Sequence, residues 1–347
     1  MKKSEVLCLL FYKNFKKYDP RQSHVGLGNG AVFTAKVLKA NGIKAVPLGI
    51  YTIQHIREFV AQYPKATHVV IEGTWINGSD IEELCNEYLD IEFVCREHSG
   101  VTFLCVQNNA VRQVREYGQI QDRLLNFHFS ANNVRFSEFF EISYSQRCLL
   151  LNNLYPTDVN PVEKKRRSDS NQKLRISSYG ALRAGKNHPC SAAAALIISR
   201  KLGRDLEFHL NVGREPGLDA NVRGVRSILS GMAGVTLVED NWTAWAEFRH
   251  LIGAMDLNLQ PAYTETFNIV TADAIIAGVP SAVGTCVEWT PPHWQCDTDD
   301  PEDIARVGIS LLLDTDSTKD GMKALKKYQE NALDQWFGFF GVDCCDK

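Results

Sequence analysis

The sequence of 347 residues lacks any apolar run that approaches the roughly 18–20 residues needed to cross a bilayer. It also lacks a strong charge excess, because 38 Lys and Arg against 41 Asp and Glu leave a formal charge of −3. Such a chain has no overall electrostatic attraction for nucleic acid or an anionic membrane. A polyanion could therefore bind only at a local patch of positive charge. The apolar run at residues 6–11 is short and no small-residue cleavage site follows it, which favours a buried first strand over a signal peptide.

The ten cysteines form no Cys-x-x-Cys pair and no Cys/His cluster with the spacing of zinc ligands. Five of them are scattered through apolar segments, and a chain long enough for two domains of about 150 residues each does not need disulfides. We therefore expect a reducing cytoplasm and buried thiols. The scattered cysteines are Cys8, Cys85, Cys95, Cys105 and Cys148, and Cys344 and Cys345 form a terminal pair.

Short apolar strands alternate with helical patterns along the whole chain. Strands are expected at residues 6–12, 44–48, 68–72 and 91–95, with helices at 31–40, 53–62 and 79–88 between them. The alternation stops near Tyr155 and restarts with strands at 174–179, 207–212, 236–238, 257–260 and 280–283. Such a pattern predicts parallel sheets with right-handed crossovers in two α/β domains.

The interruption predicts the domain boundaries. We expect an N-terminal domain at 1–155, a linker at 156–173, a C-terminal domain at 174–325, and a C-terminal helix and tail at 326–347. The basic residues 164–167 inside the linker are interpreted as solvated, because runs of like charge usually stay disordered, although they could bind phosphate.

The first glycine-rich segment, Gly26-Leu27-Gly28-Asn29-Gly30-Ala31, fits the dinucleotide pattern G-x-G-x-x-G/A. That fingerprint needs its first glycine directly after a strand and an acidic residue about 20 residues further on. Here some thirteen residues separate Tyr12 from Gly26, and the second strand ends without a carboxylate. The segment therefore fails both tests of context, which disfavours a nicotinamide dinucleotide. A glycine-rich entry to the helix would still leave backbone N–H groups for an anion or a sugar hydroxyl.

A second loop, at residues 179–189, follows the first strand of the C-terminal domain and enters an alanine-rich helix at 190–200. Asn187 is a candidate N-cap and Pro189 suits the first helical turn. Arg183 and Lys186 would then lie beside the positive end of the helix. This arrangement fits a diphosphate and could stabilise a departing nucleoside diphosphate without a metal. From this loop alone, a solvated turn with two surface cations remains an equal alternative.

The segment at residues 257–284 carries two carboxylates around a helix start. Glu265 lies just before a helix expected at 269–277, and Asp273 lies eight positions further on, inside it. Two carboxylates at this separation can contact different parts of one ligand, such as a sugar and a ribose. The N–H groups of Phe267, Asn268 and Ile269 form a second helix start suited to an anion.

This segment resembles the retaining GT-B glycosyltransferases of the large family four, the group 1 glycosyl transferases. Their signature is Pro-Ser, then Glu-Gly-Phe-Gly, then a second glutamate seven residues after the first, then Ala-x-x-x-Gly-x-Pro. The resemblance covers most of the chain, with high specificity at 265–280 and low specificity before residue 150. It implies two facing Rossmann-like domains with parallel sheets and a C-terminal helix, expected at 322–340, that crosses back to the first domain.

The resemblance also implies roles for individual residues. Arg183 and Lys186, after Gly180, would hold the donor diphosphate, Glu265 would lie near the donor sugar, and Asp273 would hold the ribose. In the N-terminal domain, His98 would lie beside the transferred sugar and would act in catalysis with Glu265. Gly26 and Gly28 match the family's glycine-rich loop. Residues 152–156 match the Asn-Gly-Val-Asp segment before the hinge.

The departures from the family pattern concern the donor. Asp273 replaces a glutamate and is one methylene shorter, and Asn268 replaces a glycine. The helically spaced Trp242, Trp245 and Phe248 are interpreted as packing residues. No Asp-x-Asp motif is expected at a strand end, where it could bind a metal. The one candidate, Asp297-Thr298-Asp299-Asp300, lies in a proline-flanked stretch that is interpreted as solvated surface.

The function that the resemblance implies is a metal-independent hexosyl or related transfer, with retention, from a UDP- or GDP-sugar, without a cofactor. Two other interpretations stay open. One is a GT-B-shaped sugar-nucleotide epimerase or a phosphorylase, which would release sugar products without an acceptor. The other is a non-catalytic module that binds a nucleotide sugar.

The acceptor is expected at a basic loop between the first strand and the glycine-rich segment. Lys13, Lys16, Lys17 and Arg21 are interleaved there with four aromatic residues against one acid. The loop leaves the carboxyl end of a strand, and Glu72 and Trp75 should flank it. Because cations contact phosphates and aromatic rings stack on bases or sugars, a polyanion is slightly favoured, for example DNA with hydroxylated bases, over a lipid or a small-molecule acceptor. An anionic lipid, a glycan or a mere surface loop remain alternatives.

Overall fold

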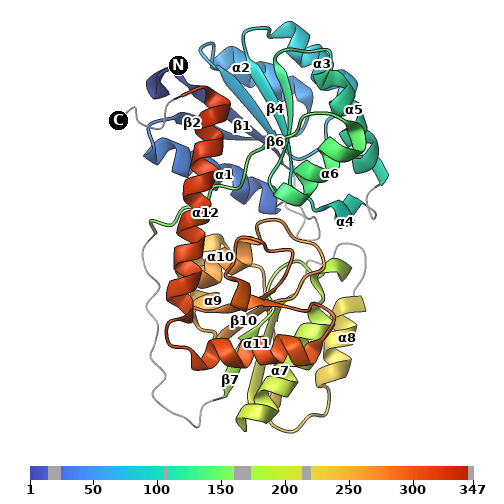
Figure 1. The fold of residues 1–347 in the computed structure, drawn as a ribbon, viewed down its shortest axis with the longest axis vertical. Helices are drawn as coiled ribbons and strands as arrows, with labels where there is room; N and C mark the ends of the chain where they lie inside the picture. The colour runs from blue at the N-terminus through green and yellow to red at the C-terminus, as the bar shows by residue number, and fades with distance from the viewer. Residues whose placement is uncertain (15–24, 105–107, 160–172, 213–219, 343–347) are drawn as a thin grey trace. The chain divides into compact units, whose positions relative to one another are not determined.

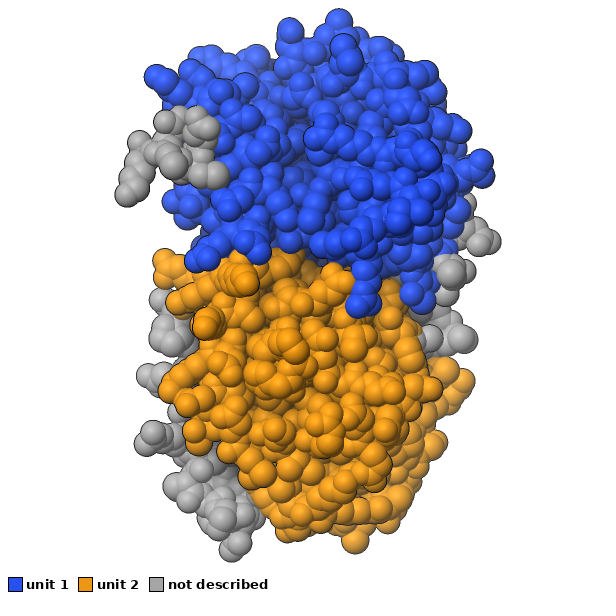
Figure 2. Space-filling view, in the orientation of Figure 1, with its two compact units in different colours: residues 1–19, 24–156, 329–347 blue, residues 20–23, 157–328 orange. Residues whose placement is uncertain are grey.

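The computed structural model describes residues 1–14, 25–104, 108–159, 173–212 and 220–342 (Figure 1). The chain divides into two compact units (Figure 2). Unit 1 comprises residues 1–19, 24–156 and 329–347, and unit 2 comprises residues 20–23 and 157–328. No helix in the described residues is long and apolar enough to span a membrane.

Unit 1 contains a parallel sheet of six strands in the order β2-β1-β3-β4-β5-β6. The strands are β1 Leu7–Lys13, β2 Lys44–Ile50, β3 His68–Glu72, β4 Glu92–Glu97, β5 Phe127–Ala131 and β6 Leu149–Leu150. The helices are α1 Val25–Ala40, α2 Ile53–Gln62, α3 Gly78–Glu87, α4 Val101–Leu104, α5 Asn108–Gln121 and α6 Val134–Tyr144, after a short 3-10 turn at Lys3–Glu5.

Both faces of this sheet are buried, as the apolar composition of its strands predicts. Successive residues of β1 alternate between the two faces, so Leu9 and Phe11 enter one core cluster while Cys8 and Leu10 enter the other. The second cluster also contains Trp336, from the last helix of the chain. The C-terminal segment therefore completes the core of the first unit.

Unit 2 contains a second parallel sheet of six strands in the order β12-β11-β10-β7-β8-β9. The strands are β7 Leu174–Ser177, β8 Leu206–Asn211, β9 Val235–Asp240, β10 Leu257–Gln260, β11 Ser281–Gly284 and β12 Gln295–Cys296. The helices are α7 His188–Leu202, α8 Ala220–Leu229, α9 Trp245–Gly253, α10 Ile269–Ile276, α11 Pro301–Leu313 and α12 Ser317–Phe340, with 3-10 turns η2 at Ala184–Lys186 and η3 at Pro292–Trp294.

Helix α12 contributes to both units, because the division between them falls after Tyr328. Beyond that point, the side-chain oxygens of Gln329 and Gln335 accept hydrogen bonds from the backbone N–H groups of Tyr155 and Asn152, both at 2.9 Å. The indole of Trp336 donates to the Asn152 carbonyl at 2.9 Å. The predicted α/β fold with two parallel sheets and a returning C-terminal helix is confirmed.

The prediction of a glycine-rich loop before the first helix is wrong, because these glycines belong to the helix itself. Gly26, Gly28 and Gly30 lie inside α1, which begins at Val25, six residues earlier than predicted. A Cβ at Gly28 would lie 3.2 Å from the Tyr12 ring, so this glycine allows the helix to pack closely against β1. Gly26 and Gly28 therefore form helix backbone rather than an open loop.

The cysteines that the structure describes are free thiols, and Cys8, Cys85, Cys95, Cys148 and Cys296 are buried. Burial raises the pKa of Cys85 and of Cys148 to about 12. These thiols are therefore packing residues at neutral pH. Cys105 and the basic residues 164–167 lie outside the described residues.

Candidate functional site

Five polar side chains meet at the carboxyl ends of neighbouring strands in unit 1. Glu72 ends β3, Arg96 and His98 lie at and after the end of β4, Asn132 follows β5, and Asn153 follows β6. Ligands of open α/β sheets bind at this edge, so the position itself marks a candidate site.

A buried ion pair forms the base of this group. The Arg96 Nη1 donates to both oxygens of Glu72, at 2.8 and 2.7 Å, and neither side chain has any exposed surface. The Nη2 of Arg96 donates to Asn153 Oδ1 at 2.7 Å and to the Leu151 carbonyl at 3.0 Å. The guanidinium also lies over the Trp336 ring, 5.0 Å from its centroid. All three nitrogens of the Arg96 guanidinium thus donate hydrogen bonds to protein groups.

His98 completes a closed ring of hydrogen bonds. Its Nε2 lies 2.5 Å from Glu72 Oε2, and its Nδ1 lies 3.4 Å from the amide nitrogen of Asn132, which also donates to Asn153 Oδ1 at 3.4 Å. Burial alone would raise the pKa of Glu72, but Arg96 and His98 lower it below the usual value. Since an ionised carboxylate only accepts, the proton of His98 resides on Nε2.

The backbone that carries His98 is fixed by Glu97. This nearly buried carboxylate accepts hydrogen bonds from the N–H groups of His98 and Ser99, at 2.9 and 2.7 Å, and from Thr74 Oγ1 at 2.7 Å. The loop after β4 therefore holds its histidine in one orientation before any ligand arrives. The sequence analysis gave no role to Arg96, Glu97 or Asn132 and named Asn153 only within the segment 152–156, because nothing in their spacing shows that four strand ends converge.

The expectation that Glu72 flanks the acceptor loop is wrong for its side chain, which is fully buried beneath Arg96 and His98. Trp75 is half-buried, and its indole donates to the Glu72 carbonyl at 3.0 Å. The ammonium of Lys13, the last residue of β1, lies 5.6 Å from the centroid of the Trp75 ring. Lys13 and Trp75 thus come together as predicted, while Lys16, Lys17 and Arg21 lie outside the described residues.

In unit 2, the loop after β7 carries the predicted cations. Lys186 forms an ion pair with Glu265, and their side chains are only 11% and 12% exposed. Arg183 is partly exposed and begins the turn that η2 completes, since its carbonyl accepts from the Lys186 N–H at 2.9 Å. The structure therefore brings together Lys186 and Glu265, which were predicted from two distant segments of the sequence, and places Arg183 in the same turn as Lys186.

Two details of this loop differ from the sequence interpretation. Asn187 precedes α7 with φ 55° but does not cap it, because its amide donates to the Thr298 carbonyl at 2.6 Å. The N–H of Gly180 donates to Asn211 Oδ1 at 3.2 Å and is therefore not available to a phosphate in this structure. Gly180 adopts φ +125°, a conformation that disfavours residues with a side chain.

His188, the first residue of α7, was missed by the sequence analysis. It is buried, and its Nδ1 has no hydrogen-bond partner among the described residues. Burial, with Lys186 and Arg183 nearby, lowers the pKa of His188 to about 3. The imidazole is therefore neutral at physiological pH. A histidine at a helix start carries no sequence signal that distinguishes this role from ordinary packing.

The loop before α10 is held by its own side chains. Asn268 adopts φ 55°, caps the helix through Oδ1 to the Thr271 N–H at 3.0 Å, and donates to Gln260 Oε1 at 3.1 Å. Asparagine tolerates the left-handed region better than most residues, so it can adopt a conformation that otherwise favours glycine. Ile269 begins the helix, so the expected second helix start is present.

Phe267 belongs to an aromatic cluster that the sequence did not reveal. Its ring stacks on Trp289 and on Tyr328, with centroids 5.4 and 5.1 Å away. The Trp289 indole donates to the Phe267 carbonyl at 2.6 Å. Phe267 therefore anchors the Glu265 loop to the middle of α12 and is itself buried, so a ligand would meet its backbone rather than its ring.

Asp273 is only 2% exposed, and its Oδ1 accepts a hydrogen bond from the Trp245 indole at 2.7 Å. The interpretation of Trp245 as a packing residue is therefore incomplete, because its polar atom binds one of the two predicted carboxylates. Asp297, Asp299 and Asp300 are exposed, as the interpretation of a surface stretch predicts, although Asp297 directly follows the short strand β12. Its Oδ1 accepts from the Asp299 N–H, and Asp299 accepts from Tyr263 Oη at 2.6 Å, so the segment packs against the loop after β10.

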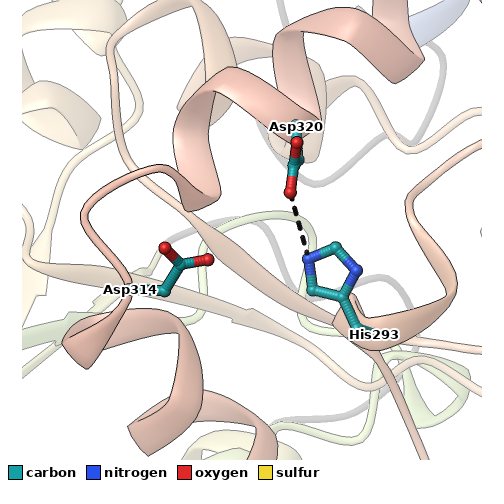
Figure 3. Close-up of side chains that lie close together, drawn as sticks. All are labelled: His293, Asp314 and Asp320. Carbon is teal, nitrogen blue, oxygen red and sulfur yellow. Dashed lines mark ion pairs between the residues drawn. The ribbon is translucent and has the colours of Figure 1, made fainter.

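One group of side chains in the described residues has the spacing of a metal site, namely His293, Asp314 and Asp320 (Figure 3). All three are exposed, and the single ion pair among them, between His293 and Asp320, is 3.7 Å long. They come from η3, the residue after α11, and α12, rather than from the loops that carry Lys186 and Glu265. We assign no function to this group.

No protein-family profile matches the sequence, and no curated protein matches it in a sequence search. Solved structures match over most of the chain. Sucrose-phosphate synthase from Thermosynechococcus elongatus matches with a TM-score of 0.66 and 13% identity, over 96% of this chain and 98% of that one. A UDP-forming trehalose-phosphate synthase from Burkholderia xenovorans matches with a TM-score of 0.61 and 10% identity, over 98% of both chains.

TarM from S. aureus, in a structure with UDP, matches with a TM-score of 0.60 and 11% identity over 82% of this chain. The chain spans only 57% of TarM. The two parallel sheets and the returning C-terminal helix thus give this chain the GT-B fold.

Proposed function

We propose that this chain is a nucleotide-sugar-dependent glycosyltransferase that transfers a hexosyl or related group with retention. The observation that carries the proposal is the meeting of Lys186 and Glu265 beside the start of α7, where Arg183 also lies. Two cations, a helix start and a carboxylate are the groups that a sugar diphosphate needs at its charged and hydroxylated parts. The match in fold to enzymes that form or bind UDP supports the proposal.

In the proposed reaction, Arg183 and Lys186 bind the donor diphosphate and stabilise the charge that develops as it leaves. Lys186 is held by Glu265 in the structure described. A bound donor would therefore insert its phosphate oxygens beside Lys186 while Glu265 contacts the sugar hydroxyls. Neutral His188 adds a polar atom at the same helix start without adding a third positive charge.

His98 is proposed to contact the transferred sugar, with its orientation set by Glu72 and Asn132. Because Glu72 and Asn132 engage its two nitrogens, the ring is fixed in orientation rather than free to rotate. The acceptor hydroxyl attacks on the face from which the diphosphate departs, which preserves the anomeric configuration.

The test of this function is a thermal-shift screen with UDP- and GDP-sugars, because a ligand that binds only the folded chain raises its melting temperature. A shift with one nucleotide sugar, and transfer of its sugar to an acceptor with the anomeric configuration retained, would support the proposal. The absence of any shift across the panel would contradict it. Release of free sugar products without an acceptor would instead indicate an epimerase or phosphorylase.

Transfer is expected to proceed undiminished in EDTA, because Arg183, Lys186 and the α7 start supply the positive charge that a metal would otherwise provide. The measurement is turnover with and without the chelator. Complete loss of turnover, restored by Mn²⁺ or Mg²⁺, would contradict metal independence. The variant Asp314→Asn/Asp320→Asn is the control, since it removes the exposed carboxylates of Figure 3 and should leave turnover unchanged.

The acceptor is proposed to be a polyanion that contacts the basic loop, for example DNA with hydroxylated bases. Replacing Lys13, Lys16, Lys17 and Arg21 together by serine is expected to weaken acceptor binding and to flatten its salt dependence, because each lost phosphate contact lowers the salt slope. Donor affinity, measured separately, should not change. Wild-type acceptor affinity and salt slope in this variant would exclude the loop as the acceptor platform.

A further inference from the structure

The carboxylate expected to contact the donor ribose is held by a residue outside the two donor loops. Asp273 lies in α10, and the residue that binds its Oδ1, Trp245, is the first residue of α9. A carboxylate buried to this degree requires hydrogen-bond donors, since an unsatisfied polar group away from water is strongly unfavourable. The Trp245 indole N–H, at 2.7 Å, is such a donor.

The helix face that carries Asp273 lies beside the β7–α7 loop. Val270 Cγ2 would contact a Cβ at Gly180, 3.9 Å away, and Asp273 lies one turn further along the same face of α10. Ala274 and Ala277 on that face pack with Tyr179, which directly precedes Gly180. Asp273 thus lies next to the loop whose cations are proposed to bind the diphosphate, at the side where α9 begins.

The Trp245 ring is itself fixed. The Arg249 guanidinium, one turn further along α9, lies over it at 5.4 Å from the ring centroid, and Arg249 is largely buried. The indole N–H therefore has little freedom to turn away from Asp273. A hydrogen bond from a fixed donor sets the plane of the carboxylate and hence the direction in which its lone pairs point.

We propose that Trp245 is a positioning residue for donor binding, which orients the Asp273 carboxylate toward the ribose hydroxyls of the nucleotide. The inference rests on the proposed function. It explains how an aspartate serves where the resembling enzymes have a glutamate: the shorter side chain is directed by the indole of α9. Trp245 acts through Asp273 and therefore affects recognition of the ribose rather than the transfer step.

The experiment compares ribonucleotides with their deoxy forms. Binding of UDP, GDP, 2′-deoxy-UDP and 2′-deoxy-GDP is measured by calorimetry on the full chain and on Trp245→Phe, which keeps an aromatic ring but removes the N–H. The wild-type chain is expected to prefer one ribonucleotide over its deoxy form by at least about tenfold, as a charge-assisted hydrogen bond would give. In Trp245→Phe this preference should fall below about threefold, with little change in affinity for the deoxy form.

Trp294→Phe is the matched control, because Trp294 is buried in the same unit and its indole N–H has no hydrogen-bond partner among the described residues. It should retain the wild-type preference. An unchanged preference in Trp245→Phe, an equal loss of affinity for both nucleotides, or a wild-type chain that does not distinguish them would overturn the inference and leave the proposed function standing. A wild-type chain that binds none of the four nucleotides would overturn both.

Discussion

Replacing Lys186 by alanine is expected to slow sugar transfer by at least about tenfold. A charge-assisted contact to a phosphate contributes roughly 1.5–3 kcal/mol, and each 1.36 kcal/mol of lost transition-state stabilisation is about tenfold in rate. Lys186 is also the partner of the nearly buried Glu265. Arg183→Ala should give a loss of the same order, since the two cations flank one helix start. Steady-state turnover with the donor identified by thermal shift is the measurement.

The double variant Lys186→Ala/Glu265→Gln separates two causes of this loss. If Lys186→Ala fails only because Glu265 is left without a partner, removing the carboxylate's charge should restore donor affinity. If Lys186 binds the diphosphate, donor affinity should stay low in the double variant. Recovery there, or wild-type affinity and turnover in Lys186→Ala and Arg183→Ala, would refute the proposed diphosphate site.

Lys201 provides the control for charge removal on the same helix. It lies in the last turn of α7 and pairs with Glu302 on the surface, where the two side chains are 52% and 63% exposed. Exposed pairs of this kind contribute about 0–1 kcal/mol. Lys201→Ala should therefore leave turnover within about twofold of the wild type.

The fold was predictable because its signal is repeated along the chain. Each apolar strand followed by a helix gives the same βα unit, and the strands expected at 6–12, 68–72 and 257–260 correspond to β1, β3 and β10 within about one residue. The start of α1 was not predictable in the same way. Glycine lowers helix propensity, and only the close packing of Gly28 on Tyr12 explains why a helix contains Gly26, Gly28 and Gly30.

In the candidate site, too, residues next to a local sequence signal were predictable, and residues fixed by tertiary contacts were not. Arg183, Lys186 and Glu265 stand next to local signals, a strand end or a helix start, and the structure pairs Lys186 with Glu265. Glu72 also stands at a strand end, but its burial depends on Arg96 one strand away and on the turn after β6. The hydrogen bond between Trp245 and Asp273 likewise joins two residues that lie 28 positions apart in the sequence and in different helices. Contacts of this kind depend on tertiary packing and leave no periodic pattern in the sequence.

Replacing Arg96 by methionine is expected to destabilise unit 1 by roughly 3–5 kcal/mol, because it leaves the Glu72 carboxylate buried without its cation. The Leu151 carbonyl and Asn153 would lose their donors as well. Amide hydrogen exchange of β3 and β4 measures the effect within this unit, since protected core amides report opening free energies up to that of global unfolding. Arg123→Met is the control, because Arg123 pairs with Glu82 on the surface.

The pH dependence of this penalty identifies its cause. In the wild-type chain the pKa of Glu72 is lowered from 4.5, so its stabilisation is complete above that value and is lost as the pH falls through the lowered pKa. Without Arg96, burial should raise the pKa of Glu72 above 4.5, so that folding takes up a proton. The penalty of Arg96→Met should therefore be smaller at pH 5 than at pH 8. The variant Glu72→Leu/Arg96→Met, which removes both charges, should be more stable than Arg96→Met and should show no such pH dependence. A penalty that is equal at both pH values, or a double variant less stable than Arg96→Met, would show that the buried charge of Glu72 is not what Arg96 compensates.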